Sequence, residues 1–362
     1  MIELLCTNCQ NLAENFLSWK CKYCGSPLRA ESKKPFDLNK VNYSERSLWR
    51  YKRFLYSTKV ISLGEGNTPI VKLNERCYLK LEYLNPTGSF KDRGSTSLIS
   101  ALYSEIKGKV AVEDSSGNAG ASIACYCSRA NIRCKIFAPY KIQEAKARQI
   151  LAFKAKLVRV KGKREKLFKL AIKEASKEGH FYASHIWNPF FILGNTTIAY
   201  ELLKVIKTKD IHYIFLPVSA GTLLLGLIYG LEKLLKDGAI EYIPKVIACQ
   251  VDRISPLYHT LKGLSYYPPK RISTIADALV STKPVRLKEM VNAIKRNGGD
   301  CMIAKDSEIL KAKRDLARRG FFLEPSSALA YACYKKVLKM NFIKDEKSLI
   351  LLTGHGLKSN II

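Results

Sequence analysis

The chain has 362 residues, of which 47% are hydrophobic, so it is long enough for two or more domains and apolar enough to bury a core. Length and composition together exclude a small module that lacks a core of its own. The 61 Lys and Arg residues outnumber the 31 Asp and Glu residues and give a formal net charge of +30, so the surface must be strongly basic.

A basic surface permits attraction of nucleic acids or other anions. Residues 153–179 are rich in Lys and Arg, yet these are spread around expected helices without a regular interleaving of aromatic side chains. We therefore interpret the charge as a solvated surface of the Lys-rich kind found in thermophile proteins, and we expect no nucleic-acid partner. An anionic cofactor and anionic substrates would need only a few of these charges.

The sequence predicts no membrane association. The N-terminal residues lack the basic region and the long apolar stretch of a signal peptide. The longest uncharged run, residues 214–231, is interrupted by Pro217, Ser219 and Gly221, and we interpret it as a buried strand, turn and helix. Seven of the eleven cysteines stand in apolar surroundings, as expected of reduced core residues, so we expect a cytoplasmic protein.

The other four cysteines form two close pairs, Cys6 with Cys9 and Cys21 with Cys24, in the spacing C-x₂-C-x₁₁-C-x₂-C. Each pair can present two thiolates on one side of a tight turn, and four thiolates make a closed tetrahedral zinc site. An iron centre and two disulfides are the alternatives. Gly25 suits the turn after Cys24. We therefore predict a structural zinc-binding module over residues 1–34, whose fold depends on the metal.

Beyond the module, short β-branched runs alternate with helical patterns. Strands are expected at residues 109–112, 135–138, 157–160, 213–218, 245–250 and 349–352. Helices are expected at residues 94–106, 119–130, 143–153, 164–178, 222–235 and 306–320, after a linker and a basic amphipathic helix within residues 32–55. Strands that alternate with helices predict an α/β fold with parallel sheets covered on both faces, whose ligands gather at the carboxyl ends of the strands.

The run Asn-Pro-Thr-Gly-Ser-Phe-Lys-Asp-Arg-Gly at residues 85–94 singles out Lys91. Pro86 and Gly88 predict a turn, Phe90 supplies apolar cover, and a helix follows. A lysine in a fixed, partly desolvated position can be neutral enough to attack a carbonyl. A lone lysine in a turn is usually a surface residue, and it is the surrounding context that favours a reactive one.

Three further motifs stand at strand ends that lead into a helix or a turn. The first offers backbone N–H groups at a helix start, where anions bind, and comprises Ser115, Ser116, Gly117 and Asn118. The second repeats that arrangement, suits a phosphate, and comprises Ser219, Ala220, Gly221, Thr222 and Leu223. The third follows the last expected strand and begins at Thr353. Each motif alone could be an ordinary helix cap.

Together and in this order, the motifs resemble those of the threonine synthase group of pyridoxal-phosphate enzymes, which share the tryptophan-synthase-β-like fold. Residues 64–69 and 324–328 resemble two other segments of that group, so the resemblance extends from Cys6 to Lys358. It implies two doubly wound parallel-sheet domains with the cofactor between them. Residues 35–100 and 201–362 would form the larger cofactor domain and residues 101–200 a smaller inserted one, preceded by an N-terminal zinc ribbon at residues 1–34.

The resemblance also implies roles for the motifs. Lys91 would hold pyridoxal 5′-phosphate and act as the catalytic acid and base. The loop of Ser115, Ser116, Gly117 and Asn118 would receive the substrate carboxylate, and Asn118 would contact the ring hydroxyl of the cofactor. Residues 219–223 would bind the cofactor phosphate, although the group usually has Gly-Asn-Gly where this chain has Ser-Ala-Gly. Thr353 would face the pyridine nitrogen, where a neutral hydroxyl favours elimination and replacement over transamination.

One segment departs from the pattern of the group. Where threonine synthases typically carry Asn-Ser-x-Asn-Pro-Tyr-Arg, this chain has His185, Ile186 and Phe191 at the Asn, Ser and Arg positions, and Thr196 replaces a later Lys. Those polar groups help hold the phosphate of O-phosphohomoserine, and Phe191 in place of Arg removes a bidentate donor. His185 either replaces one donor in substrate binding or caps the strand.

We therefore predict a pyridoxal-phosphate-dependent lyase of the threonine synthase type, which converts O-phosphohomoserine and water to threonine and phosphate. The first alternative is an enzyme of the same group for β-elimination or β-replacement on serine, threonine or O-phosphoserine. The second is a non-catalytic scaffold that binds nucleic acid or protein, and intact Lys91, Asn118 and Thr353 count against it. A small amino-acid substrate and a homodimer are implied by the resemblance.

Overall fold

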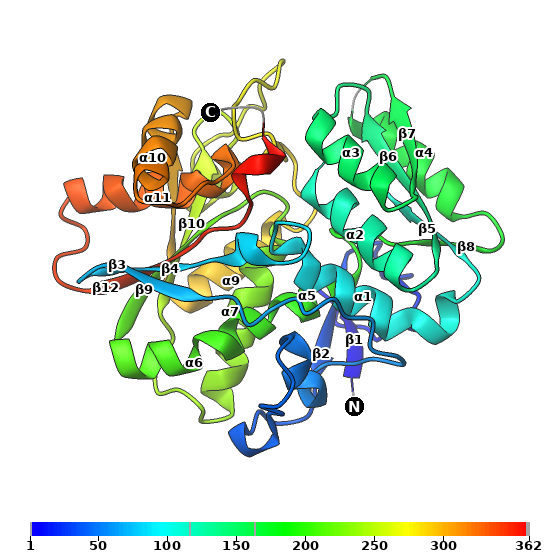
Figure 1. Cartoon of the computed structure of the whole chain (residues 1–362), viewed down its shortest axis with the longest axis horizontal. Coiled ribbons are helices and arrows are strands. Elements are labelled where there is room, and N and C mark those ends of the chain that lie inside the picture. The colour runs from blue at the N-terminus through cyan, green and yellow to red at the C-terminus, as the bar shows by residue number, and fades with distance from the viewer. Residues whose placement is uncertain (1, 116, 163, 360–362) are drawn as a thin grey trace. The chain divides into compact units, whose positions relative to one another are not determined.

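A computed structural model describes residues 2–115, 117–162 and 164–359 of the chain (Figure 1). The chain divides into two compact units: unit 1 comprises Met1–Asn67 and Asn85–Thr197, and unit 2 comprises Thr68–Leu84 and Ile198–Ile362. Each unit is built on its own largely parallel sheet, which confirms the predicted α/β class. The domain boundaries that we expect from the sequence differ from this division, because they assign residues 35–67 and 85–100 to the larger domain and not to the unit that contains residues 101–197. Those boundaries stay a prediction.

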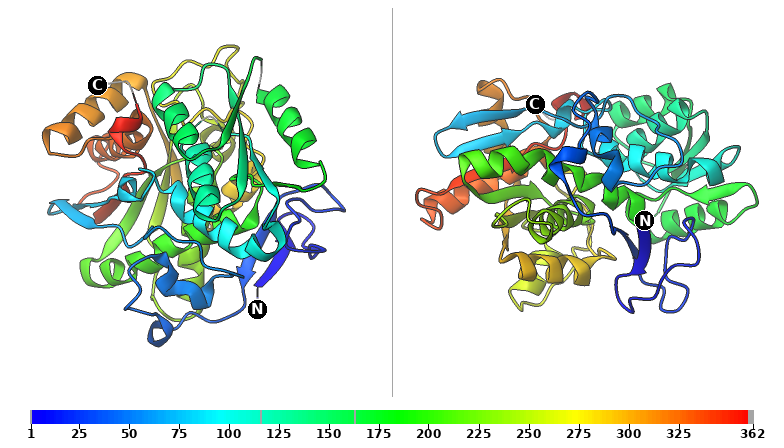
Figure 2. Two further views of the ribbon diagram at one scale, coloured as in Figure 1. Left: turned by 45° about the vertical axis from the view of Figure 1, so that its right-hand side comes forward. Right: turned by 90° about the horizontal axis from the view of Figure 1, so that it is seen from below.

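The N-terminal module of unit 1 is a two-stranded antiparallel sheet with long connecting loops (Figure 2). β1 (Ile2–Cys6) pairs with β2 (Leu28–Ser32), so that Cys6 lies opposite Leu28. Two 3₁₀ helices follow, η1 (Leu38–Lys40) and η2 (Leu48–Phe54). The basic amphipathic helix predicted within residues 32–55 is therefore present only as the short 3₁₀ helix η2, in which Lys52 and Arg53 are exposed. Leu48, Trp49, Tyr51 and Phe54 of η2 are buried, and the backbone kinks at Tyr51.

The main sheet of unit 1 has four parallel strands in the order β7-β6-β5-β8. They are β5 (Val110–Glu113), β6 (Arg133–Pro139), β7 (Lys156–Val160) and β8 (His180–Tyr182). Its helices are α1 (Lys91–Ile106), α2 (Asn118–Arg129), α3 (Glu144–Ala152), α4 (Arg164–Ala175) and α5 (Pro189–Asn195). The segment that becomes β8 was not predicted as a strand, because three residues are too few for a periodicity signal.

Alternation of side chains along these strands builds two cores, one on each face of the sheet. Ala111 and Ile136 belong to a large cluster that includes side chains of α1, α2 and α3. The intervening residues Val112 and Phe137 belong to a separate cluster with Leu167 of α4. Since successive side chains of a strand point to opposite faces, apolar residues at consecutive positions require helices on both faces.

Unit 2 contains a six-stranded sheet in the order β11-β10-β9-β12-β4-β3, in which only the β3–β4 pair is antiparallel. Its strands are β3 (Ile70–Asn74), β4 (Cys77–Lys80), β9 (Ile211–Pro217), β10 (Lys245–Val251), β11 (Asp300–Ala304) and β12 (Lys347–Leu351). Its helices are η3 (Glu82–Leu84), α6 (Thr197–Lys209), α7 (Thr222–Lys236), α8 (Pro256–Leu261), α9 (Leu287–Asn297), α10 (Asp306–Arg318), α11 (Pro325–Lys339) and η4 (Gly356–Lys358).

The sheet of unit 2 is also covered by helices. Phe215, Ile247 and Ile350 pack in one cluster with residues of α10 and α11. On the neighbouring positions of the same strands, Leu216 and Ala248 are fully buried, and α9 packs against both β10 and α7. The strands of this unit therefore read as continuous apolar runs, which is what the sequence displayed at residues 213–218 and 245–250.

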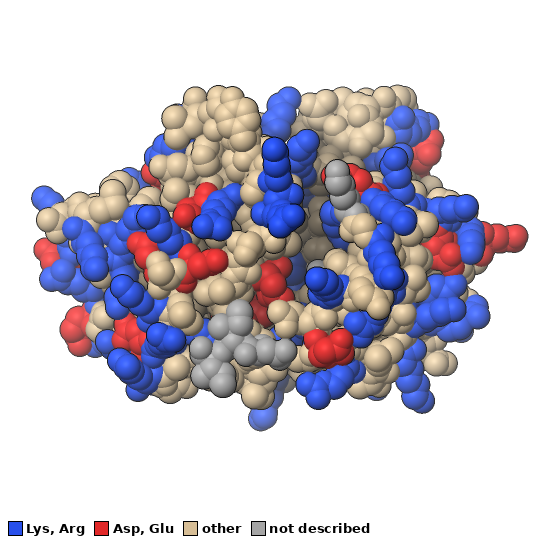
Figure 3. Space-filling view, turned by 90° about the horizontal axis from the view of Figure 1, so that it is seen from above, with Lys and Arg blue, Asp and Glu red and all other residues tan. Residues whose placement is uncertain are grey.

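The surface is basic, as the composition requires. Figure 3 shows Lys and Arg side chains spread over the face that it draws, with Asp and Glu side chains among them. Among the described residues, no helix has the length and apolarity needed to cross a membrane.

Candidate functional site

Lys91 is the first residue of α1, and the turn before it is held by a buried carboxylate. Asp92 accepts hydrogen bonds from both the backbone N–H and the hydroxyl of Thr87, each at 2.7 Å. The hydroxyl of Ser122 on α2 donates to the same carboxylate at 2.6 Å. Because Asp92 is fully buried, these bonds operate in a low-dielectric environment and hold the backbone next to Lys91 rigidly.

The amine of Lys91 lies against two aromatic rings. Its Nζ atom is 4.8 Å from the centre of the Phe90 ring and 5.6 Å from the centre of the Phe191 ring. Phe191 is fully buried on α5. The helices α1 and α5 come this close because each carries a glycine at the contact: a Cβ atom on Gly94 would lie 2.4 Å from the Phe191 ring, and one on Gly194 would lie 2.1 Å from a backbone oxygen of α1. Lys91 thus has the fixed, partly desolvated position that its sequence context predicts.

The loop that follows β5 leads directly into α2. Ser115 and Asn118 are buried, and the Ser115 hydroxyl accepts a hydrogen bond of 3.3 Å from the N–H of Gly117. The N-cap residue of α2 is Gly117, which has no side chain to cap the helix, and its carbonyl accepts a hydrogen bond from the N–H of Ala121. This arrangement points backbone N–H groups out of the helix start, as an anion-binding loop requires. Ser116, which the sequence also predicts to bind substrate, lies outside the described residues.

His185 follows β8, and its partner is a residue that the sequence reasoning did not single out. The Nδ1 atom of His185 is 2.5 Å from Oε1 of Glu113, and the backbone N–H of His185 donates to Oε2 of the same carboxyl at 3.0 Å. The two residues meet because β5 and β8 are neighbouring parallel strands, with Val112 opposite Tyr182. The ring of His185 therefore does not cap β8, and Glu113 fixes both the ring and the backbone of this residue.

Burial determines the protonation of this pair. It raises the pKa of Glu113 to about 8, against weaker opposing effects that include the hydrogen bond from the His185 backbone. Burial, together with the positive charge of Lys91, lowers the pKa of His185 well below its usual value of 6.5. At neutral pH the pair accordingly holds one exchangeable proton between Glu113 and His185 and carries no net charge.

A second carboxyl lies next to the pair. Burial raises the pKa of Asp114 to about 6, although the charge of Arg164 works in the opposite direction. Arg164 on α4 and the hydroxyl of Tyr182 on β8 each contact Asp114 at 2.5 Å. The Arg164 side chain is 47% exposed, so solvent screens its charge and its effect on the pair.

The residues that depart from the threonine synthase pattern offer few hydrogen-bond donors. The Thr196 hydroxyl donates to the backbone oxygen of Leu193 at 2.7 Å, and Phe191 presents only its ring. His185 is bound to Glu113 through Nδ1. Two of the positions that usually hold a phosphate are thus filled by an apolar face and by a hydroxyl already engaged with the backbone.

In unit 2, residues 219–223 form the turn between β9 and α7. Gly221 has φ +94°, a conformation that favours glycine, and a Cβ atom there would lie 2.3 Å from the sulfur of Met290, whose side chain would have to move. The helix begins at Thr222 without a side-chain cap. Ala220 and Leu223 are buried beside it. The N-terminal dipole of a long, buried helix suits an anion such as a phosphate.

Thr353 lies at the end of β12, the strand that neighbours β9 in parallel orientation. It is buried, and its backbone N–H donates to the Ser327 hydroxyl at 2.8 Å. Because the carboxyl ends of adjacent parallel strands meet at one edge of a sheet, unit 2 presents the turn at 219–223 and Thr353 at the same edge. Unit 1 likewise presents the loop at 115–118 and His185 at one sheet edge, and also contains Lys91.

Two functional candidates were missed from sequence, Glu113 and Ser89. Glu113 and Asp114 are consecutive acids at the end of an apolar strand, a signal that could have revealed a buried charged pair. Ser89 is fully buried two residues before Lys91, and within the described part of the chain its hydroxyl has no hydrogen-bond partner. Buried hydroxyls are rarely left in that state, so the group is expected to meet a bound molecule.

The four predicted metal-binding cysteines come together in the N-terminal module. The sulfur atoms of Cys6, Cys9, Cys21 and Cys24 all lie within 4.8 Å of one another. The shortest separations are 3.4 Å between Cys6 and Cys24, 3.5 Å between Cys9 and Cys24, and 3.6 Å between Cys9 and Cys21. A metal bound tetrahedrally at about 2.3 Å from each thiolate would separate the sulfurs by about 3.8 Å, so the cluster has the right size.

The two cysteine turns have the same backbone geometry. The N–H of Gln10 donates to the carbonyl of Cys6 at 3.3 Å, and the N–H of Gly25 donates to the carbonyl of Cys21 at 2.9 Å. Each turn therefore places its two thiolates on one side, as the paired spacing predicts. Backbone N–H groups also point at a thiolate, since Asn8 and Cys9 each contact the Cys6 sulfur at 3.4 Å.

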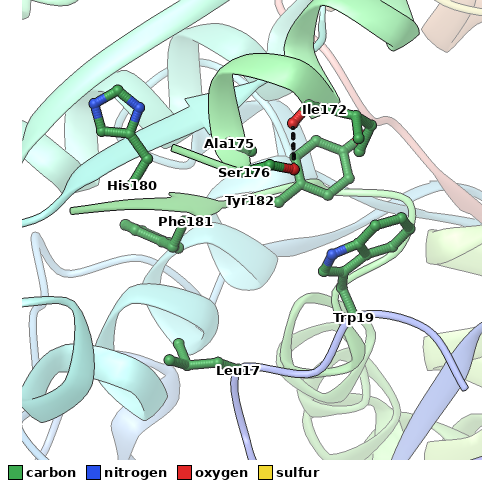
Figure 4. A pocket seen from close by; sticks show the side chains of 8 residues that line it. All are labelled: Leu17, Trp19, Ile172, Ala175, Ser176, His180, Phe181 and Tyr182. Carbon is green, nitrogen blue, oxygen red and sulfur yellow. Dashed lines mark hydrogen bonds between the residues drawn. The ribbon is translucent and has the colours of Figure 1, made fainter. Parts of the chain in front are cut away.

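The loop between the cysteine pairs packs on the segment that carries His185. Trp19 lies 5.2 Å from the ring of Tyr182 and 5.1 Å from the ring of Trp187, edge to face in both cases. Phe16 packs in the same way on Phe190, at 5.6 Å. A cavity of about 180 Å³ lies beside Trp19 and Tyr182 and is lined mostly by apolar side chains (Figure 4). The module thus braces the segment on both sides of His185.

Comparison with known proteins identifies the family of the chain. A family model described as pyridoxal-phosphate dependent enzyme matches residues 61–354. The threonine synthase of Methanocaldococcus jannaschii is 32% identical over 88% of this chain and 82% of that enzyme. The threonine synthase of Methanosarcina acetivorans is 29% identical over 99% of this chain and 92% of that enzyme. Among solved structures, maize serine racemase matches with a TM-score of 0.70 at 20% identity, over 80% of this chain and 89% of that one, which is a likeness of fold.

The residues present fit the cofactor that this family implies. Pyridoxal phosphate has an aldehyde that needs an amine, a phosphate that needs N–H donors and a ring nitrogen that needs a polar partner. In unit 1, Lys91 would supply the amine. In unit 2, the start of α7 would supply the donors and Thr353 a buried hydroxyl. The buried hydroxyl of Ser89, next to Phe90 and Lys91, gives a further polar group for a ligand at this point.

Proposed function

The chain belongs to the pyridoxal-phosphate-dependent enzymes, and from that premise we propose that it is a lyase of the threonine synthase type, acting on O-phosphohomoserine and water to give threonine and phosphate. The observation that carries the proposal is the position of Lys91 at the start of α1, between two aromatic rings and on a backbone held by Asp92. Similarity to threonine synthases over most of the chain supports the choice of reaction.

When bound, the cofactor would supply the electron sink for removal of protons and leaving groups from the substrate. Lys91 would hold the cofactor and, once the substrate amine replaces it, would move protons at the substrate carbons. Ser115, Gly117 and Asn118 would orient the substrate carboxylate through the start of α2. Residues 219–223 would anchor the cofactor phosphate, and Thr353 would act as a neutral partner of the ring nitrogen.

Two measurements test the assignment of Lys91. The purified protein with pyridoxal phosphate should absorb in the visible range, and borohydride should fix the cofactor to the peptide that contains Lys91. Lys91→Ala should lose both the fixed cofactor and turnover, whereas Lys107→Ala, a change of an exposed lysine just after the same helix, should lose neither. Retention of the fixed cofactor and of threonine formation by Lys91→Ala would refute the proposal.

The second candidate function is β-elimination or β-replacement on serine, threonine or O-phosphoserine. The observation that favours it is Phe191, whose buried ring lies on Lys91 where threonine synthases typically have an arginine. A phosphate dianion that loses charged partners is costly to desolvate. Release of phosphate and threonine from O-phosphohomoserine supports the first function, while release of ammonia from serine or threonine, without the former reaction, supports the second.

For the N-terminal module we propose a structural zinc ion held by Cys6, Cys9, Cys21 and Cys24. The support is the sulfur cluster and the matching geometry of its two turns. Four thiolates leave no open coordination position, which is typical of structural sites. The seven other cysteines are buried as free thiols, in keeping with the reducing cytoplasm that we propose as the compartment. A homodimer is proposed from the family resemblance, and sedimentation analysis would test it.

A further inference from the structure

The Glu113–His185 pair has the construction of a proton-transfer device. Glu113 is fully buried and holds His185 at two points, at 2.5 Å through Nδ1 and at 3.0 Å through the backbone N–H. Within the described part of the chain, Nε2 of His185 makes no hydrogen bond, so it is the ring nitrogen left for a ligand. A carboxylate that orients one nitrogen of an imidazole so that the other can exchange protons is a recurrent catalytic arrangement.

The position of the pair places it with the residues proposed to handle the substrate. Both members lie at the carboxyl ends of neighbouring strands, and Glu113 stands two residues before Ser115, the first residue of the loop proposed to bind the substrate carboxylate. The His185 ring stands edge-on to the Phe191 ring, with 5.9 Å between centres, and Lys91 Nζ lies on that same ring. The buried ring of Phe191 thus lies against both the His185 ring and the Lys91 amine, and it covers both with an apolar surface.

We propose that Glu113 and His185 form a proton-transfer pair for the proposed lyase reaction, in which Nε2 of His185 gives a proton to the departing oxygen of the substrate and later takes one from the incoming water. His185 is the residue that would touch the substrate, and Glu113 is the positioning residue that holds Nδ1. This inference rests on the proposed function and adds to it a proton donor for the departing oxygen of the substrate. The Arg and Lys that threonine synthases typically carry are replaced here by Phe191 and Thr196, which cannot serve as that donor.

The protons and electrons balance over the two steps. In the first, after Lys91 has taken one proton from Cα and one from Cβ, the Nε2–H bond breaks, the Cγ–O bond of the substrate breaks, and its electron pair stays on the oxygen that receives the proton. The pair is then singly negative, with one proton left between Nδ1 and the Glu113 carboxyl. In the second step a water O–H bond breaks, the water oxygen bonds to Cβ, the proton returns to Nε2, and Lys91 returns the two carbon-bound protons to Cα and Cγ. No oxidant or reductant is needed.

Burial is the largest cause of this neutral, protonated resting state, and the charged groups around the pair act in both directions. Lys91 from α1 lowers the pKa of both His185 and Glu113, whereas Asp114, the residue after β5, raises the pKa of His185. Arg164 from α4 compensates Asp114 at 2.5 Å, and Tyr182 from β8 donates to the other oxygen of that carboxyl. Burial raises the pKa of Glu113 to about 8, so the pair keeps its exchangeable proton at neutral pH.

The first test needs neither cofactor nor turnover. Nitrogen-15 NMR of the five histidines of the cofactor-free protein should show His185 with a proton on Nε2 from about pH 5 to 7.5 and a transition near pH 8. Glu113→Gln should abolish that transition, because an amide cannot exchange the proton. An ordinary histidine titration for His185, or an unprotonated Nε2 at pH 7, would overturn the proposal.

The second test uses leaving groups of different basicity. His185→Gln should lower kcat for O-phosphohomoserine by roughly 10²- to 10⁴-fold, the usual contribution of a general acid or base. The loss should be smaller for carboxylate esters of homoserine, whose leaving group is less basic and needs less protonation. The wild-type rate should fall above pH 8, and the variant should lose that limb of the profile.

His180→Gln is the matched control, since His180 lies on β8 itself, five positions before His185, and its ring contacts the backbone of α4. This variant should keep the wild-type rate and pH profile. Equal losses on all esters, with an unchanged pH profile, would leave His185 with a structural role and overturn the inference. Absence of bound cofactor and turnover in the wild-type protein would instead refute the proposed function, and NMR would still decide the state of the pair.

Discussion

Glu113 reaches across 72 positions of the chain to hold both the imidazole and the backbone N–H of His185. The carboxyl has no exposed surface, and the imidazole side chain is 11% exposed, so the pair connects the interior of unit 1 with the edge of its sheet. A residue held at two points keeps one orientation, which is the property that a proton donor requires.

The first prediction concerns stability and pH. The raised pKa of Glu113 means that the native state keeps a proton which the unfolded chain releases between about pH 4.5 and 8, so stability falls as pH rises. The lowered pKa of His185 acts in the opposite direction below pH 6.5 and cancels this loss there. The net loss is thus confined to pH 6.5–8 and amounts to about 2 kcal/mol.

Glu113→Gln should remove that slope, which denaturant unfolding at a series of pH values would measure. Glu165→Gln, a change of an exposed residue on α4, should leave the slope as it is in the wild-type protein. If both variants show the wild-type pH dependence, Glu113 does not carry the proton.

The second prediction concerns Ser89. Its buried hydroxyl lacks a partner among the described residues, so Ser89→Ala should leave the cofactor-free protein as stable as before or more stable by about 1 kcal/mol. If the hydroxyl binds the cofactor, the same change should weaken cofactor binding by roughly fivefold to tenfold, the value of about one hydrogen bond. Thermal unfolding and absorbance titration give the two quantities separately. Loss of stability without the cofactor would show a role in packing instead.

The third prediction concerns the turn before α7. Gly221→Ala combines a positive φ with a Cβ position 2.3 Å from the Met290 sulfur, so it should destabilise unit 2 and weaken cofactor binding. Gly238→Ala is the control, because Gly238 also has a positive φ but its Cβ position is free of neighbours within 4 Å. The control should cost only about 1 kcal/mol and should leave cofactor affinity unchanged. Equal effects of the two variants on cofactor affinity would contradict the assignment of residues 219–223.

The fourth prediction concerns the metal. The protein should contain about one zinc ion per chain, and Cys21→Ser with Cys24→Ser should lose it while cofactor binding persists. Because Trp19 packs on Trp187 and Tyr182, loss of the metal should expose Trp19 and shift the tryptophan emission to longer wavelength. Trp49, the third tryptophan, is buried away from the module loop and provides a constant background. Metal loss without a change in emission would mean that the loop packs independently of the metal.

The sequence by itself determined the features whose signal is local. The alternation of strands and helices predicted the α/β class, and the paired cysteine spacing predicted the sulfur cluster. The residues around Lys91 predicted a turn followed by a helix from Gly94, and the helix begins three residues earlier, at Lys91 itself. Each of these depends on residues within a turn or two of one another, where spacing and residue type constrain the backbone directly.

Only the tertiary structure decided which distant residues meet. Glu113 contacts His185 because the sheet order places β8 beside β5, although β6 and β7 come between them in sequence. Phe191 lies on Lys91 because Gly94 and Gly194 allow α1 and α5 to approach closely. Periodicity shows that a segment has a buried face but not which partner covers it, since strand order and helix packing follow from the free energy of the whole core.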